Sequence, residues 1–234
     1  MHNFLLRQQG VRAGRLHELY SAPPTLQDGP TMMNDDDEDH DVPVSHKAPK
    51  ITAPKGRDGR LVDLPSRLYM DRIVWLGSEI DASVSNSIIQ QLTALALEDA
   101  TKPITLYINS PGGSIVDGMA IYDVIRRSTA PVHAVVVGMA ASMGAVILSG
   151  CKKGERAILP HGEVLLHQPL GGARGQATDI EISANRILKM KKMLLQLLAE
   201  NTGHPFEKLA EDCDRDYWLD AEDALKYGII DKIL

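Results

Sequence analysis

The sequence is poor in aromatic residues and cysteine, and it has no long apolar run. Aromatic residues make up 4% of the 234 residues, against 44% for all hydrophobic residues, so the core must be mainly aliphatic. Cys151 and Cys213 give neither a disulfide framework nor metal-site spacing, and they favour a reducing compartment. No segment approaches the ~20 apolar residues of a membrane-spanning helix. We therefore expect a soluble, cytoplasmic protein without a membrane span or bound metal.

Basic charge is also scarce. Lys and Arg number 25 against 31 Asp and Glu, which gives a net charge of −6. Proteins that bind nucleic acid or anionic membranes normally carry a basic face, and this balance argues against both classes. The length suits one globular domain with an attached tail.

Composition changes sharply near residue 65. Before it the chain has a weakly basic start, then prolines, an acidic run at 35–41 and a stretch rich in Pro, Lys and Gly. Such segments bury too little apolar surface to offset the entropy of ordering. We expect 1–60 to be a disordered tail or propeptide and 61–234 to be the folded domain. If the basic start is instead a transit peptide, the protein would belong in an organelle stroma or matrix.

From residue 66 onward, apolar segments typical of strands alternate with amphipathic helical patterns. Asp81 and Asp220 are expected to begin helices, and Gly228 to end one. The alternation predicts an α/β layered domain with crossover connections. Strands are expected at 72–77, 104–109, 132–137, 157–159, 164–167 and 229–234.

The longest predicted helix spans 178–202. A capping box of Thr178 and Glu181 is expected at its start, and Gly203 at its end. Its apolar positions are more numerous than one domain face needs. We therefore expect part of this helix to be buried against another subunit.

Ser142 is the first candidate for chemistry. It stands among small residues, after an apolar strand and at the start of an apolar helix. A strand–turn–helix junction exposes the side chain at the turn, and the helix N-terminus favours a developing negative charge. The same position also suits a plain helix N-cap, and the residues alone leave both roles open.

His167 and a nearby acidic cluster could complete such a site. His167 ends an apolar strand, and imidazole titrates in the range that a general base needs; a satisfied strand-end histidine is the other interpretation. Asp212, Asp214 and Asp216 precede the last helix, and any of them could orient an imidazole or belong to a loop ion-pair cluster.

The turn at 110–113 is a further candidate. Two glycines after a buried strand permit backbone conformations that leave N–H groups pointing outward, as an oxyanion hole requires. An ordinary turn would have the same composition.

Together these pieces resemble one family closely, the proteolytic subunit of Clp protease (ClpP). The resemblance covers about residues 66–234, and motifs of this length are highly specific. It rests on the segments SRLYMDRIVWLG (66–77), YINSPGG (107–113), GMAASMGA (138–145), LPHGEVLLHQPLGGARGQATDIE (159–181) and DRDYWLDAEDALKYGIIDKIL (214–234).

The resemblance implies a serine endopeptidase. Ser142 matches the nucleophile, His167 the general base and Asp216 the carboxylate that orients it. Gly113 and Met143 match the positions whose backbone N–H groups form the oxyanion hole. No metal or organic cofactor is implied.

It also implies an α/β spiral of ββα units related to crotonases, with a protruding strand-helix handle at 171–203. Members of the family stack two heptameric rings through these handles, and the ring here could contain this subunit alone or a second ClpP-type subunit as well. Asp214 and Arg215 match ring-ring contacts. An AAA+ unfoldase would deliver unfolded polypeptides, as in protein quality control. The substrate would pair with a strand formed by Gly171, Gly172, Ala173 and Arg174.

The surface expected to dock the unfoldase departs from the family pattern. Tyr107 keeps an aromatic side chain, but Thr105 replaces a common second aromatic, and Arg127 stands where an apolar residue is usual. We therefore expect weak binding of a standard unfoldase.

Three alternatives remain beside the peptidase. A crotonase-type acyl-CoA enzyme would not need the Ser, His and Asp, and a non-catalytic ring subunit normally lacks one of them. A Ser–Lys dyad is disfavoured by the intact His167.

Overall fold

The computed structural model divides the chain into two units, 1–52 and 53–234. The predicted tail, 1–60, lies outside the described residues apart from Gly59. Within the described part, no helix has both the length and the apolarity to cross a bilayer. The described residues, all in the second unit, are 59, 61–172 and 174–234.

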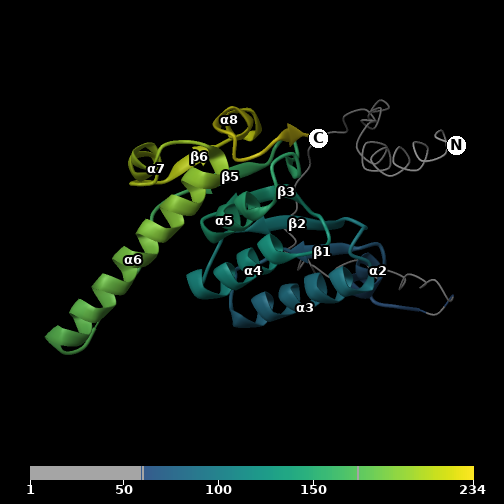
Figure 1. Ribbon diagram of the computed structural model, residues 1–234, viewed down its shortest axis with the longest axis horizontal. Helices are drawn as coiled ribbons and strands as arrows, with labels where there is room; N and C mark the ends of the chain where they lie inside the picture. Colours follow the sequence, from purple (N-terminus) through teal and green to yellow (C-terminus); the bar gives the residue numbers. More distant parts are fainter. Residues whose placement is uncertain (1–58, 60, 173) are drawn as a thin grey trace, which may run out of the picture. The chain divides into compact units, whose positions relative to one another are not determined.

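A seven-stranded sheet forms the centre of the described part (Figure 1). Five strands are parallel in the order β1-β2-β3-β4-β7, while β5 pairs with the end of β3 and, antiparallel, with β6. This topology confirms the predicted α/β class with crossover connections. The bounds are β1 (Ile73–Leu76), β2 (Ile104–Ser110), β3 (Val132–Ala141), β4 (Arg156–Ile158), β5 (Glu163–Leu166), β6 (Tyr217–Leu219) and β7 (Lys232–Ile233).

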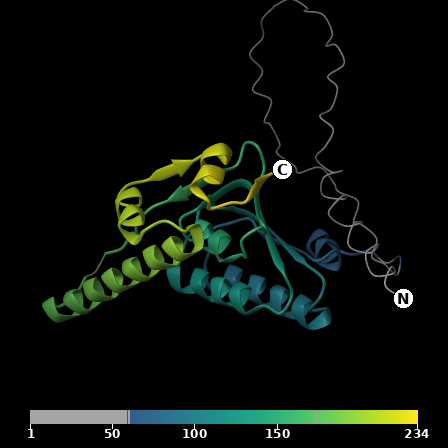
Figure 2. The same ribbon diagram turned by 45° about the horizontal axis from the view of Figure 1, so that its top comes forward.

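Helices α3 and α4, which connect the first parallel strands, lie side by side, whereas α8 lies away from them next to β5 and β7 (Figures 1 and 2). The expected N-caps are confirmed, because the Asp81 and Asp220 carboxylates each accept a 2.8 Å hydrogen bond from a backbone N–H three residues later. Two short helices, α2 and α7, were not predicted. The bounds are α2 (Leu64–Met70), α3 (Ala82–Glu98), α4 (Ile115–Arg127), α5 (Met143–Gly150), α6 (Ala177–Thr202), α7 (Phe206–Asp212) and α8 (Ala221–Tyr227).

Alternate residues of the central strands point to opposite faces of the sheet. In β2, Leu106 and Ile108 enter the main core, while Tyr107 lies on the other face in a small cluster with Val135 and Ala157. Trp75 of β1 pairs with Tyr107 at 5.4 Å between ring centroids and is 47% exposed. The second face of the sheet therefore carries aromatic surface that the subunit covers only in part.

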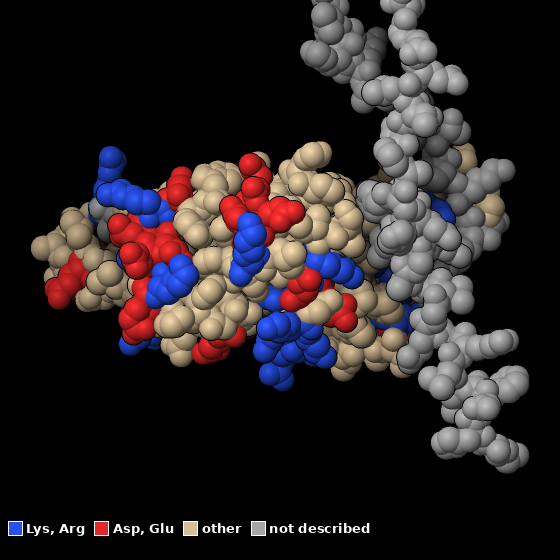
Figure 3. Space-filling view, turned by 90° about the horizontal axis from the view of Figure 1, so that it is seen from above, with Lys and Arg blue, Asp and Glu red and all other residues tan. Residues whose placement is uncertain are grey.

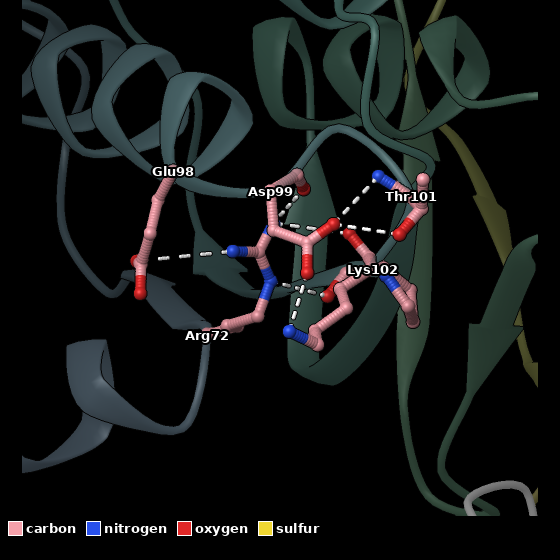
Figure 4. Close-up of polar contacts among 6 residues, drawn as sticks. Arg72, Glu98, Asp99, Thr101 and Lys102 are labelled. Carbon is pink, nitrogen blue, oxygen red and sulfur yellow. Dashed lines mark hydrogen bonds and ion pairs between the residues drawn. The ribbon is translucent and has the colours of Figure 1, made fainter.

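The loop between α3 and β2 is tied to the start of β1 (Figure 4). Arg72 donates hydrogen bonds of 3.0 Å to the carbonyl oxygens of Asp99 and Lys102, and its guanidinium lies 3.9 Å from Glu98. The Asp99 carboxylate in turn accepts from Thr101 and pairs with Lys102. This polar cluster fixes the loop at the amino-terminal end of β1.

β3 is longer than predicted and continues to Ala141. Its pairing with β2 shifts register after Ile108, and Gly138 takes a left-handed conformation (φ 89°) at the irregularity. The Asn109 side chain bridges the gap by accepting a 3.3 Å hydrogen bond from a backbone N–H of β3. The extension brings the strand directly to Ser142. The terminal strand is shorter than predicted, since β7 spans only two residues.

α6 begins earlier than its predicted capping box. The N-cap is Gln176, whose side chain makes no capping bond within the described part, so Thr178 and Glu181 lie inside the helix and the capping box is wrong. Gly203 ends the helix in the left-handed conformation, as predicted.

Most of α6 projects away from the other elements (Figures 1 and 2). Only its C-terminal half is anchored, through buried Leu194, Leu195 and Leu198. Towards its start, Ile182 and Leu188 are 62% and 63% exposed. The predicted excess of apolar surface is therefore present on the projecting part.

Charges are mixed on the face seen in Figure 3, where groups of Lys and Arg lie directly beside groups of Asp and Glu. A nucleic-acid-binding face normally carries a single-sign basic stripe. This face has no such stripe over the described residues.

Candidate active site

Ser142 lies at the junction of β3 and α5. Its backbone has φ 55° and ψ −118°, a conformation that costs a non-glycine residue free energy and is found at the sharp strand-to-helix turns of hydrolases. A 2.9 Å hydrogen bond from its N–H to the Leu165 carbonyl holds the turn. Although Ser142 occupies the N-cap position, its side chain makes no capping bond within the described part. The hydroxyl is thus left available, as a nucleophile requires.

Two glycines allow the neighbouring turn to approach this serine. A Cβ on Gly112 would lie 2.7 Å from both the Ser142 Cβ and the Ala141 oxygen, and one on Gly113 would lie 2.3 Å from the Ile80 oxygen. Both glycines also have positive φ, 96° and 144°. Only glycine can satisfy both the spacing and the backbone conformation here.

The same turn presents a backbone amide beside Ser142. Ile80 forms a parallel bridge with Gly113. The Ile80 N–H donates to the Gly112 carbonyl (2.7 Å), and the Ile80 carbonyl accepts from the Ser114 N–H (2.8 Å). This pattern directs the Gly113 N–H away from Ile80. Met143 is the first residue of α5, so its N–H has no acceptor within that helix. Gly113 and Met143 line the same cavity as Ser142, and their role as an oxyanion hole stays a prediction.

His167 follows β5 and faces Asp216, which precedes β6. The antiparallel register pairs Leu166 with Tyr217, so His167 and Asp216 come next along the two chains. The His167 Nδ1 lies 3.3 Å from an Asp216 carboxylate oxygen. The histidine side chain is 14% exposed and the aspartate 65%. An imidazole held through Nδ1 presents Nε2 for proton transfer.

The structure distinguishes Asp216 from the other two acids. The Asp212 carboxylate accepts hydrogen bonds from Lys208 (2.8 Å) and Tyr227 (2.7 Å). Burial alone would raise the pKa of Asp212, but these hydrogen bonds outweigh it and hold the pKa below its usual value. The Asp214 carboxylate lies 3.9 Å from the guanidinium group of Arg215. Of the three, Asp216 is the acid positioned on the imidazole.

Neither cysteine competes with Ser142 as a nucleophile. Burial raises the pKa of Cys151 to about 12 and that of Cys213 to about 11, so both thiols stay protonated at neutral pH. Within the described residues, no group of three His, Cys, Asp or Glu could hold a metal ion.

Ser142 and His167 line one cavity of about 350 Å³, together with Gly113 and Met143. An apolar side chain of a substrate would fit its mainly aliphatic wall. Glu79 and Lys191 are the charged residues at its border, and neither was singled out from the sequence. The apolar part of the lining consists of Pro111, Ile115, Val146, Leu166, Pro169, Leu170, Leu194, Leu195 and Leu198.

The remaining predicted residues lie around this cavity or on exposed loops. Gly171, Gly172 and Arg174 are exposed and pair with no strand of the described part, while Ala173 lies outside the described residues. Their role in binding substrate stays a prediction. Asp214 and Arg215 are 63% and 93% exposed at their side chains, and their ring contacts stay predictions too.

The sequence did not reveal the hydrogen bonds made by Gln168, the residue that follows His167. Gln168 donates a backbone hydrogen bond to the Cys213 carbonyl (2.8 Å) and a side-chain bond to the Asp214 carbonyl (2.9 Å), and its oxygen accepts from Lys191 (2.7 Å). No motif signals such contacts, because the nearest of the partners, Lys191, is 23 residues from Gln168 in sequence. The only available sign was a polar residue directly after His167.

A comparison with protein families gives one match that spans most of the chain. The family model described as Clp protease matches residues 55–234. The mixed α/β sheet described above agrees with the fold of that family.

Proposed function

Because this chain belongs to the Clp protease family, we propose that it is a serine endopeptidase subunit whose nucleophile is Ser142, with His167 as general base and Asp216 as its orienting carboxylate. The observation that carries the proposal is the 3.3 Å contact between His167 and Asp216 at the border of the cavity that Ser142 also lines.

In the proposed reaction the Ser142 hydroxyl attacks a peptide carbonyl while His167 accepts its proton. The N–H groups of Gly113 and Met143 stabilise the oxyanion, and α5 adds the positive end of its dipole. His167 then gives the proton to the leaving amine. Water, deprotonated by the same imidazole, releases the acyl group and regenerates the hydroxyl.

We further propose that the subunit works in a self-compartmentalising barrel of two stacked heptameric rings, of this subunit alone or mixed with a second ClpP-type subunit. The exposed apolar side chains of α6 support an interface there, since Ile180, Ile182 and Leu188 are 43%, 62% and 63% exposed. The highly exposed Arg215 suits the ring-ring contact. An AAA+ unfoldase would deliver unfolded chains, which would pair with residues 171–174.

The test is fluorophosphonate labelling combined with native mass spectrometry and a fluorogenic peptide assay. We expect Ser142→Ala to assemble normally, to lose labelling and to reduce turnover about 10⁶-fold. Ser87→Ala, an exposed serine on α3, is the matched control and should label normally. Undiminished peptidase activity in Ser142→Ala would reject the proposal, and so would a wild type that neither labels nor cleaves.

A further inference from the structure

The position of Asp216 is not explained by packing. Its carboxylate is 65% exposed, and it lies on the loop between α7 and β6, outside the strand ladder. An exposed loop residue gains little from burial, and an exposed ion pair contributes little to stability. Other contacts must therefore hold this loop against His167.

Gln168 supplies those contacts. It follows His167 directly, and its backbone N–H and side-chain Nε2 donate to two successive carbonyl groups of the loop, Cys213 (2.8 Å) and Asp214 (2.9 Å). The strand pairing at Leu166 holds the loop on the other side. The contact between His167 and Asp216 is thus bracketed by hydrogen bonds in both directions along the chain.

Lys191 fixes the orientation of the Gln168 amide. Its ammonium group donates to the Gln168 Oε1 at 2.7 Å, in a partly buried position. An ammonium group can only donate, so it keeps the amide oxygen on its own side. The NH₂ group must then face the Asp214 carbonyl. Without Lys191 the amide could turn over, and an oxygen would face that carbonyl instead.

Lys191 belongs to α6, one turn before the buried Leu194 and Leu195 that anchor this helix beside α5 and α7 (Figure 1). We propose, building on the serine peptidase function above, that Lys191 and Gln168 form a positioning pair that makes the alignment of Asp216 with His167 depend on the placement of α6. Neither residue reacts with the substrate. They act through the loop that carries Asp216.

The test compares Lys191→Met and Gln168→Met with Lys192→Met, an exposed neighbour on the same helix. Methionine is unbranched, matches glutamine in length and is one atom shorter than lysine, and its side chain can donate no hydrogen bond. Because small misplacements of catalytic groups cost up to about a hundred-fold, we expect the first two variants to label with a small fluorophosphonate, and to turn over peptide, about ten- to a hundred-fold more slowly. KM should change little. Lys192→Met should match wild type, and Lys191→Arg, which still donates, should recover most of the rate.

A double-variant comparison separates positioning from general destabilisation. If the pair acts through Asp216, adding Lys191→Met to Asp216→Asn should slow labelling no further. A full additional loss, or wild-type labelling by both Lys191→Met and Gln168→Met, would overturn the proposal. If Lys191→Met fails to assemble, Gln168→Met carries the test, since it leaves α6 unchanged. A wild type that does not label at all would reject the peptidase function itself.

Discussion

The two halves of the candidate site are built in different ways. Ser142 stands between β3 and α5, and every residue of α5 is buried. His167 and Asp216 lie beyond the ends of β5 and β6, and the aspartate is largely exposed. Close packing permits only one arrangement around Ser142, whereas a few hydrogen bonds hold His167 and Asp216 in place. The placement of the nucleophile thus depends on close packing, whereas the placement of its two partners depends on a few hydrogen bonds to an exposed loop.

The exposed half is also where neighbouring subunits would act. Arg215 is 93% exposed and lies beside Asp216, and Lys191 connects the loop to α6. Contacts made by α6 or by Arg215 could therefore change the alignment of Asp216. The packed half offers no comparable route, because α5 faces only other elements of its own subunit.

The comparison is tested most strongly by Asp216→Asn. An asparagine keeps the shape but removes the charge that orients and stabilises the imidazole, so turnover should fall about 10⁴-fold. Because the side chain is exposed, the denaturation midpoint in urea should stay close to that of wild type. Asp123→Asn, on the exposed face of α4, is the control for both measurements. Activity within about ten-fold of wild type would show that Asp216 is not the orienting acid.

The packed interior of the subunit, at the edge formed by β4 and β7, should respond in stability instead. Asp231 pairs at 2.7 Å with Arg156, which is 1% exposed, so Asp231→Asn leaves a buried guanidinium without a charge partner. Loss of one member of a buried ion pair costs about 3–5 kcal/mol of unfolding free energy. Urea denaturation of the variant measures this. A cost below about 1 kcal/mol would contradict a tightly packed β4–β7 edge.

The same pair gives a pH dependence. Burial would raise the pKa of Asp231, but the hydrogen bonds and charge of Arg156 outweigh it and hold the pKa below its usual value of 3.8. The ionised carboxylate therefore stabilises the fold above pH 3.8, and this contribution is lost as the pH falls below it. Asp231→Asn cannot be protonated in this range, so the part of the acid-induced loss of unfolding free energy that comes from Asp231 should be absent in this variant.

Ring stacking is the next test of the exposed half. We expect Arg215→Ala to give single rings or inactive double rings, since its side chain is available to a neighbour and adjoins Asp216. Native mass spectrometry and the peptide assay on the same sample measure both properties. Arg126→Ala, exposed on α4, should leave them unchanged. Fully stacked and fully active Arg215→Ala assemblies would contradict the coupling.

Local signals in the sequence predicted what local chemistry determines. Asp81 and Asp220 begin helices, and Gly203 and Gly228 end them, because each interaction spans only a few residues. The capping box at Thr178 failed for the opposite reason: those residues are equally acceptable inside a helix, and the start was set further upstream.

Contacts across the sheet could not be predicted in this way. From the residues alone, Asp212, Asp214 and Asp216 were equal candidates for the acid that orients the imidazole, and only the family resemblance selected Asp216. The distances from these acids to His167 depend on the β5–β6 register, which no single segment reveals. The bonds between Lys191, Gln168 and Asp214 join three elements. The hydrophobic periodicity of a single segment carries no information on contacts between three separate elements. α2, with no buried residue, offered no apolar pattern to detect.

The smallest expected effect concerns the face of the sheet that carries Tyr107 and the end of α4. By the family resemblance, Thr105 and Arg127 occupy positions where an aromatic and an apolar side chain would help to bind the apolar loop of an unfoldase. Thr105 lies between Ile73 and His133 on neighbouring strands, on the face that carries Tyr107. Loss of an aromatic anchor typically removes about 1–2 kcal/mol of binding free energy, or roughly ten-fold in affinity.

We therefore expect Thr105→Tyr/Arg127→Phe to strengthen unfoldase-stimulated degradation of a folded, tagged substrate by about ten-fold at subsaturating unfoldase. An unpaired arginine at the docking cleft also costs desolvation, which the phenylalanine removes. Cleavage of a small peptide without unfoldase should not change, because Ser142, His167 and Asp216 are untouched, and it serves as the internal control. Degradation by wild type at the full rate with a generic unfoldase would contradict the expectation of weak docking.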